Sequence, residues 1–167
     1  MLAKEIRGFS LIEILVVIAL IMLVASMASV NTHYLHKTVV HTELDLLYNT
    51  CCYLQRMAMA TNQKQELSFD AARQWYSHNG EKHELPVAVQ FGILPQVKGP
   101  PSSPLHGLTK PITFSSEKII FYPDGIISSG IIYMIDSNHQ DIYALSSGIA
   151  NASFLRKYRY DGKWRLM

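Results

Sequence analysis

The chain has 167 residues, a formal charge of +2 and 49% hydrophobic residues. So small a net charge gives no polycationic nucleic-acid surface by composition, which leaves only a local basic patch open. Its only cysteines, Cys51 and Cys52, are adjacent, so they indicate neither a disulfide framework nor a metal site with CxxC spacing. We interpret them as two small apolar residues, one of which faces a core, with an intersubunit disulfide as the alternative.

A long apolar run follows a short charged leader. Residues 1–8 contain Lys4 and Arg7, and from Phe9 to Val30 the only ionisable residue is Glu13. Roughly 20 apolar residues suffice to cross a bilayer as a helix, so we expect 9–30 to be a transmembrane segment. A carboxylate inside such a segment costs at least about 2.5 kcal/mol. This cost indicates a functional Glu13 with a cationic partner.

Two other interpretations of this run leave Glu13 unexplained. A secretory signal peptide would place a cleavage site at Ala25-Ser26-Met27-Ala28, but the run is longer than an ordinary apolar region of about 7–15 residues. A plain membrane anchor gives the carboxylate no role either.

The helix is expected to continue beyond the apolar run. Residues 31–61 contain no Pro and no Gly, and apolar side chains recur at spacings of four and three: Val40, Leu44, Leu47, Cys51, Leu54 and Ala58. This pattern predicts one buried face of an amphipathic helix. The other faces carry His41, Glu43, Asp45, Asn49, Gln55 and Arg56. We expect a single helix from Phe9 to Thr61, ended by Thr61-Asn62-Gln63.

Beyond residue 62 the apolar period changes to two and turn residues multiply, which indicates short strands. The expected strands are Gln65 to Phe69, Gln74 to His78, Leu85 to Leu94 with a bend, Ile112 to Phe114, Lys118 to Tyr122, Ile131 to Ile135, Gln140 to Leu145, Phe154 to Tyr160 and Lys163 to Leu166. Turns are expected at Asn79-Gly80, Pro123-Asp124-Gly125 and Asp161-Gly162. The Pro-rich residues 98–104 predict a surface loop.

These elements give an α+β fold. A long N-terminal helix, transmembrane in its first half and amphipathic in its second, packs on a C-terminal antiparallel β-sheet or sandwich. The expected divisions are a leader at 1–8, the transmembrane half at 9–30, the amphipathic half at 31–62 and a β-rich globular domain at 63–167.

The sequence contains no GxSxG, Walker A or HExxH motif, so we expect no catalytic residues, no metal and no cofactor. The histidines do not form a recognisable ligand set: His33, His36 and His41 follow the apolar run, His78 and His83 flank a turn and could approach each other, and His106 and His139 lie in loops. Asp124-Gly125 lacks the other ligands of a calcium loop. Basic and aromatic residues alternate near the C-terminus, in Lys157, Tyr158-Arg159-Tyr160, Lys163 and Trp164-Arg165. This pattern is typical of proteins that bind single-stranded nucleic acid, but a charged edge strand is the favoured interpretation.

The segment Gly8-Phe9-Ser10-Leu11-Ile12-Glu13 resembles the class III signal of type IV pilins and pseudopilins. A basic leader, Gly followed by Phe, Glu at this offset and an uninterrupted apolar run coincide here. The resemblance implies that a prepilin peptidase cuts between Gly8 and Phe9 and that Phe9 is N-methylated. Desolvation disfavours a lone charged carboxylate, and the N-terminal amine of a neighbouring subunit's Phe9 would compensate Glu13 and set the subunit register. The alternative is an uncharged Glu13 that faces other helices.

The C-terminal half is similar to the GspH/FimT family in Phe121-Tyr122-Pro123-Asp124-Gly125 and in Ser128-Ser129-Gly130-Ile131-Ile132-Tyr133. This resemblance implies a non-enzymatic minor pseudopilin of type II secretion. It would be a single-pass inner-membrane protein with a periplasmic C-terminal domain, incorporated into the pseudopilus after cleavage. Its partners would be other major and minor pseudopilins, the prepilin peptidase, the inner-membrane assembly platform and membrane lipid, with nucleic acid not expected. The alternatives are a minor pilin of a type IV pilus and a membrane-anchored periplasmic enzyme or ligand-binding β-domain.

Overall fold

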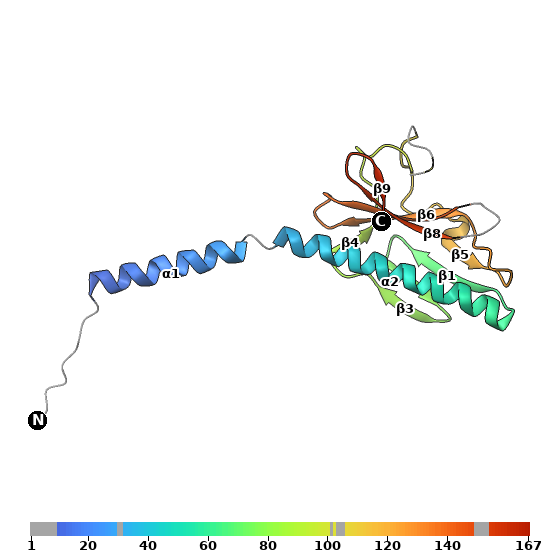
Figure 1. Cartoon of the computed structure of the whole chain (residues 1–167), viewed down its shortest axis with the longest axis horizontal. Coiled ribbons are helices and arrows are strands. Elements are labelled where there is room, and N and C mark those ends of the chain that lie inside the picture. Colours follow the sequence, from blue (N-terminus) through green and yellow to red (C-terminus); the bar gives the residue numbers. More distant parts are fainter. Residues whose placement is uncertain (1–9, 30–31, 101, 103–105, 149–153) are drawn as a thin grey trace, which may run out of the picture. The chain divides into compact units, whose positions relative to one another are not determined.

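A computed structural model of the chain describes residues 10–29, 32–100, 102, 106–148 and 154–167 (Figure 1). Side chains are described for residues 10–26 and, within those ranges, from residue 37 onward. The chain forms two compact units, residues 1–35 and 36–167. Each unit is described by itself.

The N-terminal helix, α1, spans Leu11–Ser29 and a second helix, α2, spans Thr32–Thr61. The structure thus describes two helices where a single helix from Phe9 to Thr61 was expected, and residues 9, 30 and 31 of that helix lie outside the described residues.

The transmembrane half expected at 9–30 is not confirmed. Within the part of the chain that the structure describes, neither helix combines the length and the hydropathy needed to cross a membrane.

The apolar face predicted for α2 is confirmed. All six side chains, Val40, Leu44, Leu47, Cys51, Leu54 and Ala58, are fully buried. The predicted end of the helix is confirmed too, because Asn62 adopts a left-handed conformation with φ of 53°, and the Gln63 N–H donates to the Ala58 carbonyl at 3.2 Å. This is the hydrogen bond of a Schellman ending. Glu43, expected on an outer face, is instead buried.

The strands form two antiparallel sheets. The four-stranded sheet has the order β3-β2-β1-β5, with β1 at Gln65–Asp70, β2 at Trp75–His78, β3 at Glu81–Glu84 and β5 at Lys118–Phe121. The five-stranded sheet has the order β4-β6-β7-β8-β9, with β4 at Val89–Phe91, β6 at Gly130–Asp136, β7 at Ile142–Ser147, β8 at Leu155–Tyr160 and β9 at Trp164–Leu166. A short 3-10 helix, η1, spans Ser115–Glu117.

Most expected strands are present near their predicted bounds, with three differences. Strand β3 was missed, because Glu81–Glu84 has no apolar alternation, and it pairs with β2 through the Asn79-Gly80 turn. Both turn residues have positive φ, as the tight hairpin turn requires. The expected strand at 85–94 is reduced to β4. The strand expected at 112–114 is a single bridge between Ile112 and Ile132.

The main core lies between α2 and the inner faces of both sheets. The buried face of α2 belongs to one cluster with residues of both sheets, among them Leu67, Ile119, Phe121, Ile132, Met134 and Leu145, and α2 runs along the strands in Figure 1. A second cluster covers the outer face of β6 and β7, where Tyr133, Ile135, Ile142 and Ala144 meet Leu94 and Val97. Strand β6 is therefore buried on both faces, which explains its continuous apolar run.

Two side chains fasten the loops to these sheets. Gln74, in the turn between β1 and β2, accepts a hydrogen bond from the Phe91 N–H of β4 at 2.6 Å and so joins one sheet to the other. The Trp164 indole N–H of β9 donates to the Gly99 carbonyl. Within the Pro-rich segment predicted as a surface loop, Gly99 is therefore buried, whereas Lys98 before it is exposed.

Candidate assembly site and domain surface

The start of α1 is built by Ser10 and Glu13. The Glu13 N–H donates to the Ser10 carbonyl at 3.0 Å and lies 3.3 Å from the Ser10 Oγ, and the Ile14 N–H donates to the same carbonyl at 3.3 Å. Ser10 therefore caps the helix, and Glu13 stands in the first turn, where the helix dipole favours a negative charge. Sequence reasoning missed this cap, although Ser-x-x-Glu is the pattern of a capping box.

The other two predicted site residues, Gly8 and Phe9, lie outside the described residues. Cleavage between them and methylation of Phe9 stay predictions. Glu13 is described, and its side chain is exposed.

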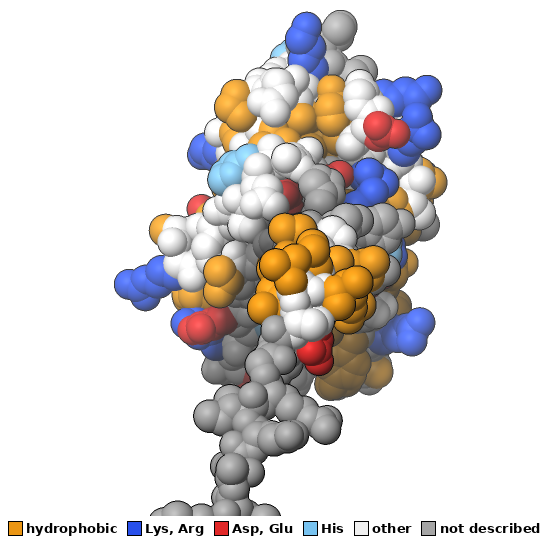
Figure 2. Space-filling model, turned by 90° about the vertical axis from the view of Figure 1, so that its left-hand side faces the viewer, with side chains coloured by type: hydrophobic (Ala, Val, Ile, Leu, Met, Phe, Trp, Pro, Cys, Tyr) orange, Lys and Arg blue, Asp and Glu red, His pale blue; other side chains and the backbone are white. Residues whose placement is uncertain are grey.

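Helix α1 is apolar on every side, and its described side chains are exposed. Leu11 is 80% exposed and Met22 is 67% exposed, with similar values along both sides of the helix. Figure 2 shows hydrophobic side chains gathered at the front of the face that it presents. A helix that is hydrophobic all round is normally covered by other apolar groups. Helix α1 thus presents a large surface for lipid or for other protein chains.

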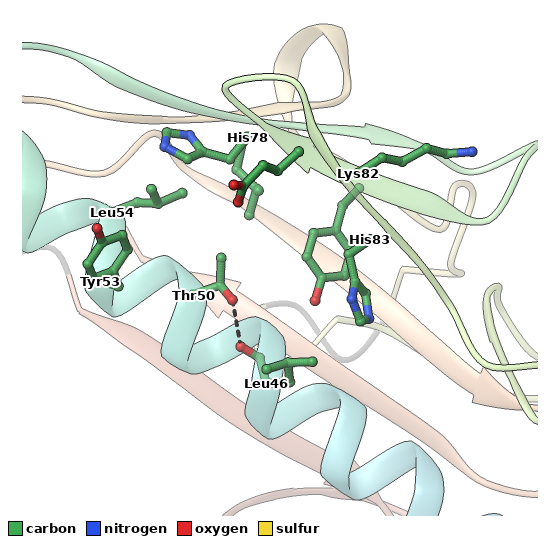
Figure 3. A pocket seen from close by; sticks show the side chains of 10 residues that line it. Leu46, Thr50, Tyr53, Leu54, His78, Lys82 and His83 are labelled. Carbon is green, nitrogen blue, oxygen red and sulfur yellow. Dashed lines mark hydrogen bonds between the residues drawn. The ribbon is translucent and has the colours of Figure 1, made fainter.

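A groove of about 320 Å³ lies between α2 and the hairpin of β2 and β3 (Figure 3). Leu54 and Leu67 are buried at its floor, whereas Leu46 and Tyr53 stand exposed on its α2 side. The hairpin contributes His78, Glu81, Lys82 and His83. Nothing in the sequence pattern pointed to this groove, because its two walls come together only through packing.

A buried carboxylate lies beside this groove. Glu43 is 5% exposed, and its Oε1 lies 2.7 Å from the His83 Nε2 and 3.4 Å from the Tyr76 hydroxyl. Burial, and then the charge of Glu43, raise the pKa of the Tyr76 phenol well above its usual range. The rings of Tyr76 and His83 also pack against each other at a tilt, with centroids 4.7 Å apart. These contacts hold the edge strand β3 against α2.

His78 and His83, which the sequence suggested could approach each other, both line the groove but meet different partners. In the hairpin His83 lies opposite Tyr76, and His78 lies opposite Glu81. His78 uses its Nδ1 to meet the Glu66 carbonyl at 3.0 Å. Among the described residues no three His, Cys, Asp or Glu side chains come together in a way that would hold a metal ion.

The remaining histidines have separate surroundings. His41 pairs with Asp45 at 3.1 Å one turn along α2, the His139 Nδ1 meets the Ser137 carbonyl at 3.2 Å, and His106 is exposed. The side chains of His33 and His36 lie outside the described residues.

The two cysteines are thiols that face different surroundings. Cys51 is buried in the α2 face, as predicted for one of the pair, and burial raises the pKa of its thiol. Cys52 is half-buried. A hydrogen bond with Cys52 raises the pKa of the Tyr48 phenol.

Several basic and aromatic side chains of the C-terminal strands make contacts within the fold. Lys157 donates to Asp45 at 2.6 Å and stands over the Tyr48 ring, and Arg159 donates to Asp141 at 3.3 Å. Tyr158, Tyr160 and Trp164 pack against the second core cluster. Strand β9 is the edge strand, whereas β8 is interior, so the predicted charged edge is confirmed only for β9. These three aromatic side chains are half-buried.

Residues 4–29 match the family model described as the prokaryotic N-terminal methylation motif. No curated protein and no solved structure matches the chain. The motif spans Gly8, Phe9 and Glu13 together with most of α1. It indicates a type IV pilin-like protein, which is a subunit of a pilus or pseudopilus that is processed by a prepilin peptidase and assembles with other pilins.

Proposed function

We propose that this chain is a minor pseudopilin of a type II secretion system. The observation that carries the proposal is the methylation motif at residues 4–29, which leads into a helix with exposed apolar side chains. In a filament, the helices of neighbouring subunits would cover that apolar surface. The choice of type II secretion rests on the resemblance of residues 121–133 to the GspH/FimT family.

In this proposal the precursor is held at the inner membrane by its N-terminal segment, with residues 36–167 in the periplasm. Cleavage after Gly8 and methylation of Phe9 give the mature subunit. The inner-membrane assembly platform then adds it to a pseudopilus beside other major and minor pseudopilins. Since the chain carries no nucleotide-binding motif, the energy for assembly comes from a partner protein.

The surface chemistry of residues 36–167 supports a structural rather than an enzymatic role. The groove beside α2 has a buried apolar floor, and its two histidines are held by Glu43 and by the Glu66 carbonyl. A hydrolytic site would instead offer a nucleophile beside an available base.

The charge distribution supports secretion over DNA uptake by a type IV pilus. On the face seen in Figure 2, Lys and Arg side chains are scattered, with acidic side chains among them. Several are paired with carboxylates, as in Lys118 with Glu66 and Arg165 with Asp161. A single-strand binding surface needs a continuous basic groove with open aromatic rings.

The experiment is a crosslinked pull-down of the tagged protein from its own host, with the mature N-terminus read by mass spectrometry in the same sample. The proposal expects a chain that starts at methylated Phe9 and is crosslinked to secretion pseudopilins. The same N-terminus with pilus pilins as partners would assign the chain to a type IV pilus. A chain that starts at Met1, or is cut after Ala28, with no pilin-like partner would contradict both assignments.

A further inference from the structure

The groove between α2 and the β2–β3 hairpin has the features of a docking surface. Leu46 and Tyr53 at its mouth are 43% and 57% exposed, and they stand beside a hollow of about 320 Å³ with an apolar floor. Adjacent exposed apolar side chains around a hollow indicate a binding surface more strongly than single exposed residues do.

Among the described charged side chains at the rim of this groove, one is left to pair with a partner. His83 is held by Glu43 at 2.7 Å, Lys82 by Glu84 at 2.6 Å, and His78 by the Glu66 carbonyl at 3.0 Å. Glu81 is exposed, and within the described ranges no ion pair engages its carboxylate. The complementary occupant is therefore a large apolar side chain with a cation beside it.

The chain itself presents that combination at the start of β8. Phe154 is 45% exposed, and the guanidinium of Arg156 lies 4.3 Å from the centroid of its ring. Arg156 is exposed, and none of the ion pairs among the described residues includes it. A phenyl ring is small enough for the groove, and Arg156 carries the positive charge that would pair with the Glu81 carboxylate.

We propose that the groove of one copy binds Phe154 of a second copy, with Arg156 paired to Glu81. Within one copy the two surfaces belong to different sheets, since Glu81 is on β3 of the four-stranded sheet and Phe154 precedes β8 of the five-stranded sheet. Because the contact joins two different surfaces, a pair held by one such contact keeps one groove and one Phe154 open, and further copies can add there unless both contacts form between the same two copies. It goes beyond the proposed function, which concerns the N-terminal segment, and it can fail without affecting that function.

The test places the photo-crosslinking residue benzoylphenylalanine at position 53 of the full-length chain in detergent micelles. Unlabelled and nitrogen-15-labelled protein are mixed before illumination, so that mass spectrometry separates crosslinks between copies from those within one. The expected product joins position 53 of one copy to residues 154–160 of the other. Crosslinks confined to one copy, or directed to another part of the second copy, would overturn the proposal.

Charge reversal then tests the specific pair. Glu81→Arg and Arg156→Glu should each lower the yield between copies by about tenfold, since like charges then meet, and the double variant should restore it to within about twofold. Glu117→Arg is the matched control, because Glu117 is exposed and precedes β5 at the opposite edge of the sheet, and it should leave the yield unchanged. An equal loss with Glu117→Arg, or no recovery in the double variant, refutes the pairing. A variant with a lowered melting temperature is replaced by Glu81→Lys or Arg156→Asp.

Discussion

The Oε1 of Glu43 lies 2.7 Å from the Nε2 of His83, although 40 residues separate them in the sequence. Glu43 belongs to α2, and His83 belongs to the edge strand β3. Glu43 is only 5% exposed, so the charge of its carboxylate must be compensated within the fold. The imidazole supplies the closest compensation, with the Tyr76 hydroxyl farther away at 3.4 Å. This one contact joins the strand with the least apolar sequence to the central helix.

Replacing His83 by Ala should destabilise the protein, because it leaves the buried Glu43 with only the Tyr76 contact. We expect a loss of about 2 kcal/mol in the free energy of unfolding, which lowers the melting temperature by about 4–8 °C. Thermal melting followed by circular dichroism measures it. His78→Ala is the matched control, since His78 meets only a backbone carbonyl at the surface. Equal losses of stability in the two variants would show that the contact between His83 and Glu43 contributes no more than a surface hydrogen bond.

Gln74→Leu should loosen the connection between the two sheets. The Gln74 side chain accepts from the Phe91 N–H at 2.6 Å and donates to the Ala71 carbonyl at 2.6 Å. Leucine leaves the N–H of a buried residue without a partner, at a cost of about 2 kcal/mol, and amide hydrogen exchange at Phe91 should become faster. Gln90→Leu is the control, because Gln90 bonds only the exposed His139. A stable Gln74→Leu variant with unchanged exchange at Phe91 contradicts this account.

The buried face of α2 could be predicted from the sequence, because six apolar positions repeat with the helical period and no Pro or Gly interrupts them. The end of the helix and the tight turns were equally readable, since Asn62, Gly80, Gly125 and Gly162 occupy the positive φ values that such residues adopt most easily. These signals are local, so they need no knowledge of the rest of the fold.

What the sequence did not reveal depends on partners that are distant in the chain. Strand β3 has the sequence Glu-Lys-His-Glu, which shows no period, and it is a strand only because β2 and Glu43 lie beside it. Glu43 was assigned to an outer face because its partner His83, 40 residues away in the sequence, could not be foreseen. In the candidate assembly site, Glu13 was found from its place in the apolar run. Its cap Ser10 was overlooked although the local pattern was present, whereas the groove arises only from packing.

The stability of the protein should fall at alkaline pH because of Tyr133. Burial raises the pKa of this phenol from 10.0 to about 12, so the unfolded chain loses this proton at a lower pH than the folded chain. The contribution of the buried, protonated Tyr133 phenol to stability is complete below pH 10.0 and is lost as the pH rises toward about 12. Melting temperatures measured at several pH values in this window should drop for the wild-type chain. The drop should be smaller for Tyr133→Phe, and parallel curves for the two proteins would show that this phenol is not responsible.

Gly8→Ala should block processing by the prepilin peptidase, because the predicted cut follows Gly8 within the motif matched at residues 4–29. Mass spectrometry of the protein from its own host should then find the uncut N-terminus. The control is Ala3→Gly, which changes the leader by the same methyl group away from the cut. A mature chain starting at Phe9 in the Gly8→Ala variant would refute the assigned site.

Replacing Glu13 separates two roles that its position suggests, a local role at the start of α1 and the pairing with a neighbouring subunit's Phe9 amine. Glu13→Ala removes both, whereas Glu13→Gln keeps the hydrogen-bonding group of a capping box but removes the charge. We expect cleavage to stay intact in both variants. Incorporation into the filament should fall by at least about tenfold in both, because the loss of one charge pair in an apolar setting exceeds the 1.4 kcal/mol that corresponds to a tenfold change.

A second measurement, of amide exchange at the start of α1, tests the local role of Glu13. Amide exchange at Glu13 and Ile14, whose N–H groups bond to Ser10, should resemble the wild type in Glu13→Gln and become faster in Glu13→Ala. Ser26→Ala is the control for substitution on the same helix, since its hydroxyl bonds the Leu23 carbonyl within α1. Normal incorporation of Glu13→Gln would eliminate the charge pairing and leave Glu13 only its local role in the first turn of α1, because glutamine keeps a hydrogen-bonding side chain there but carries no charge.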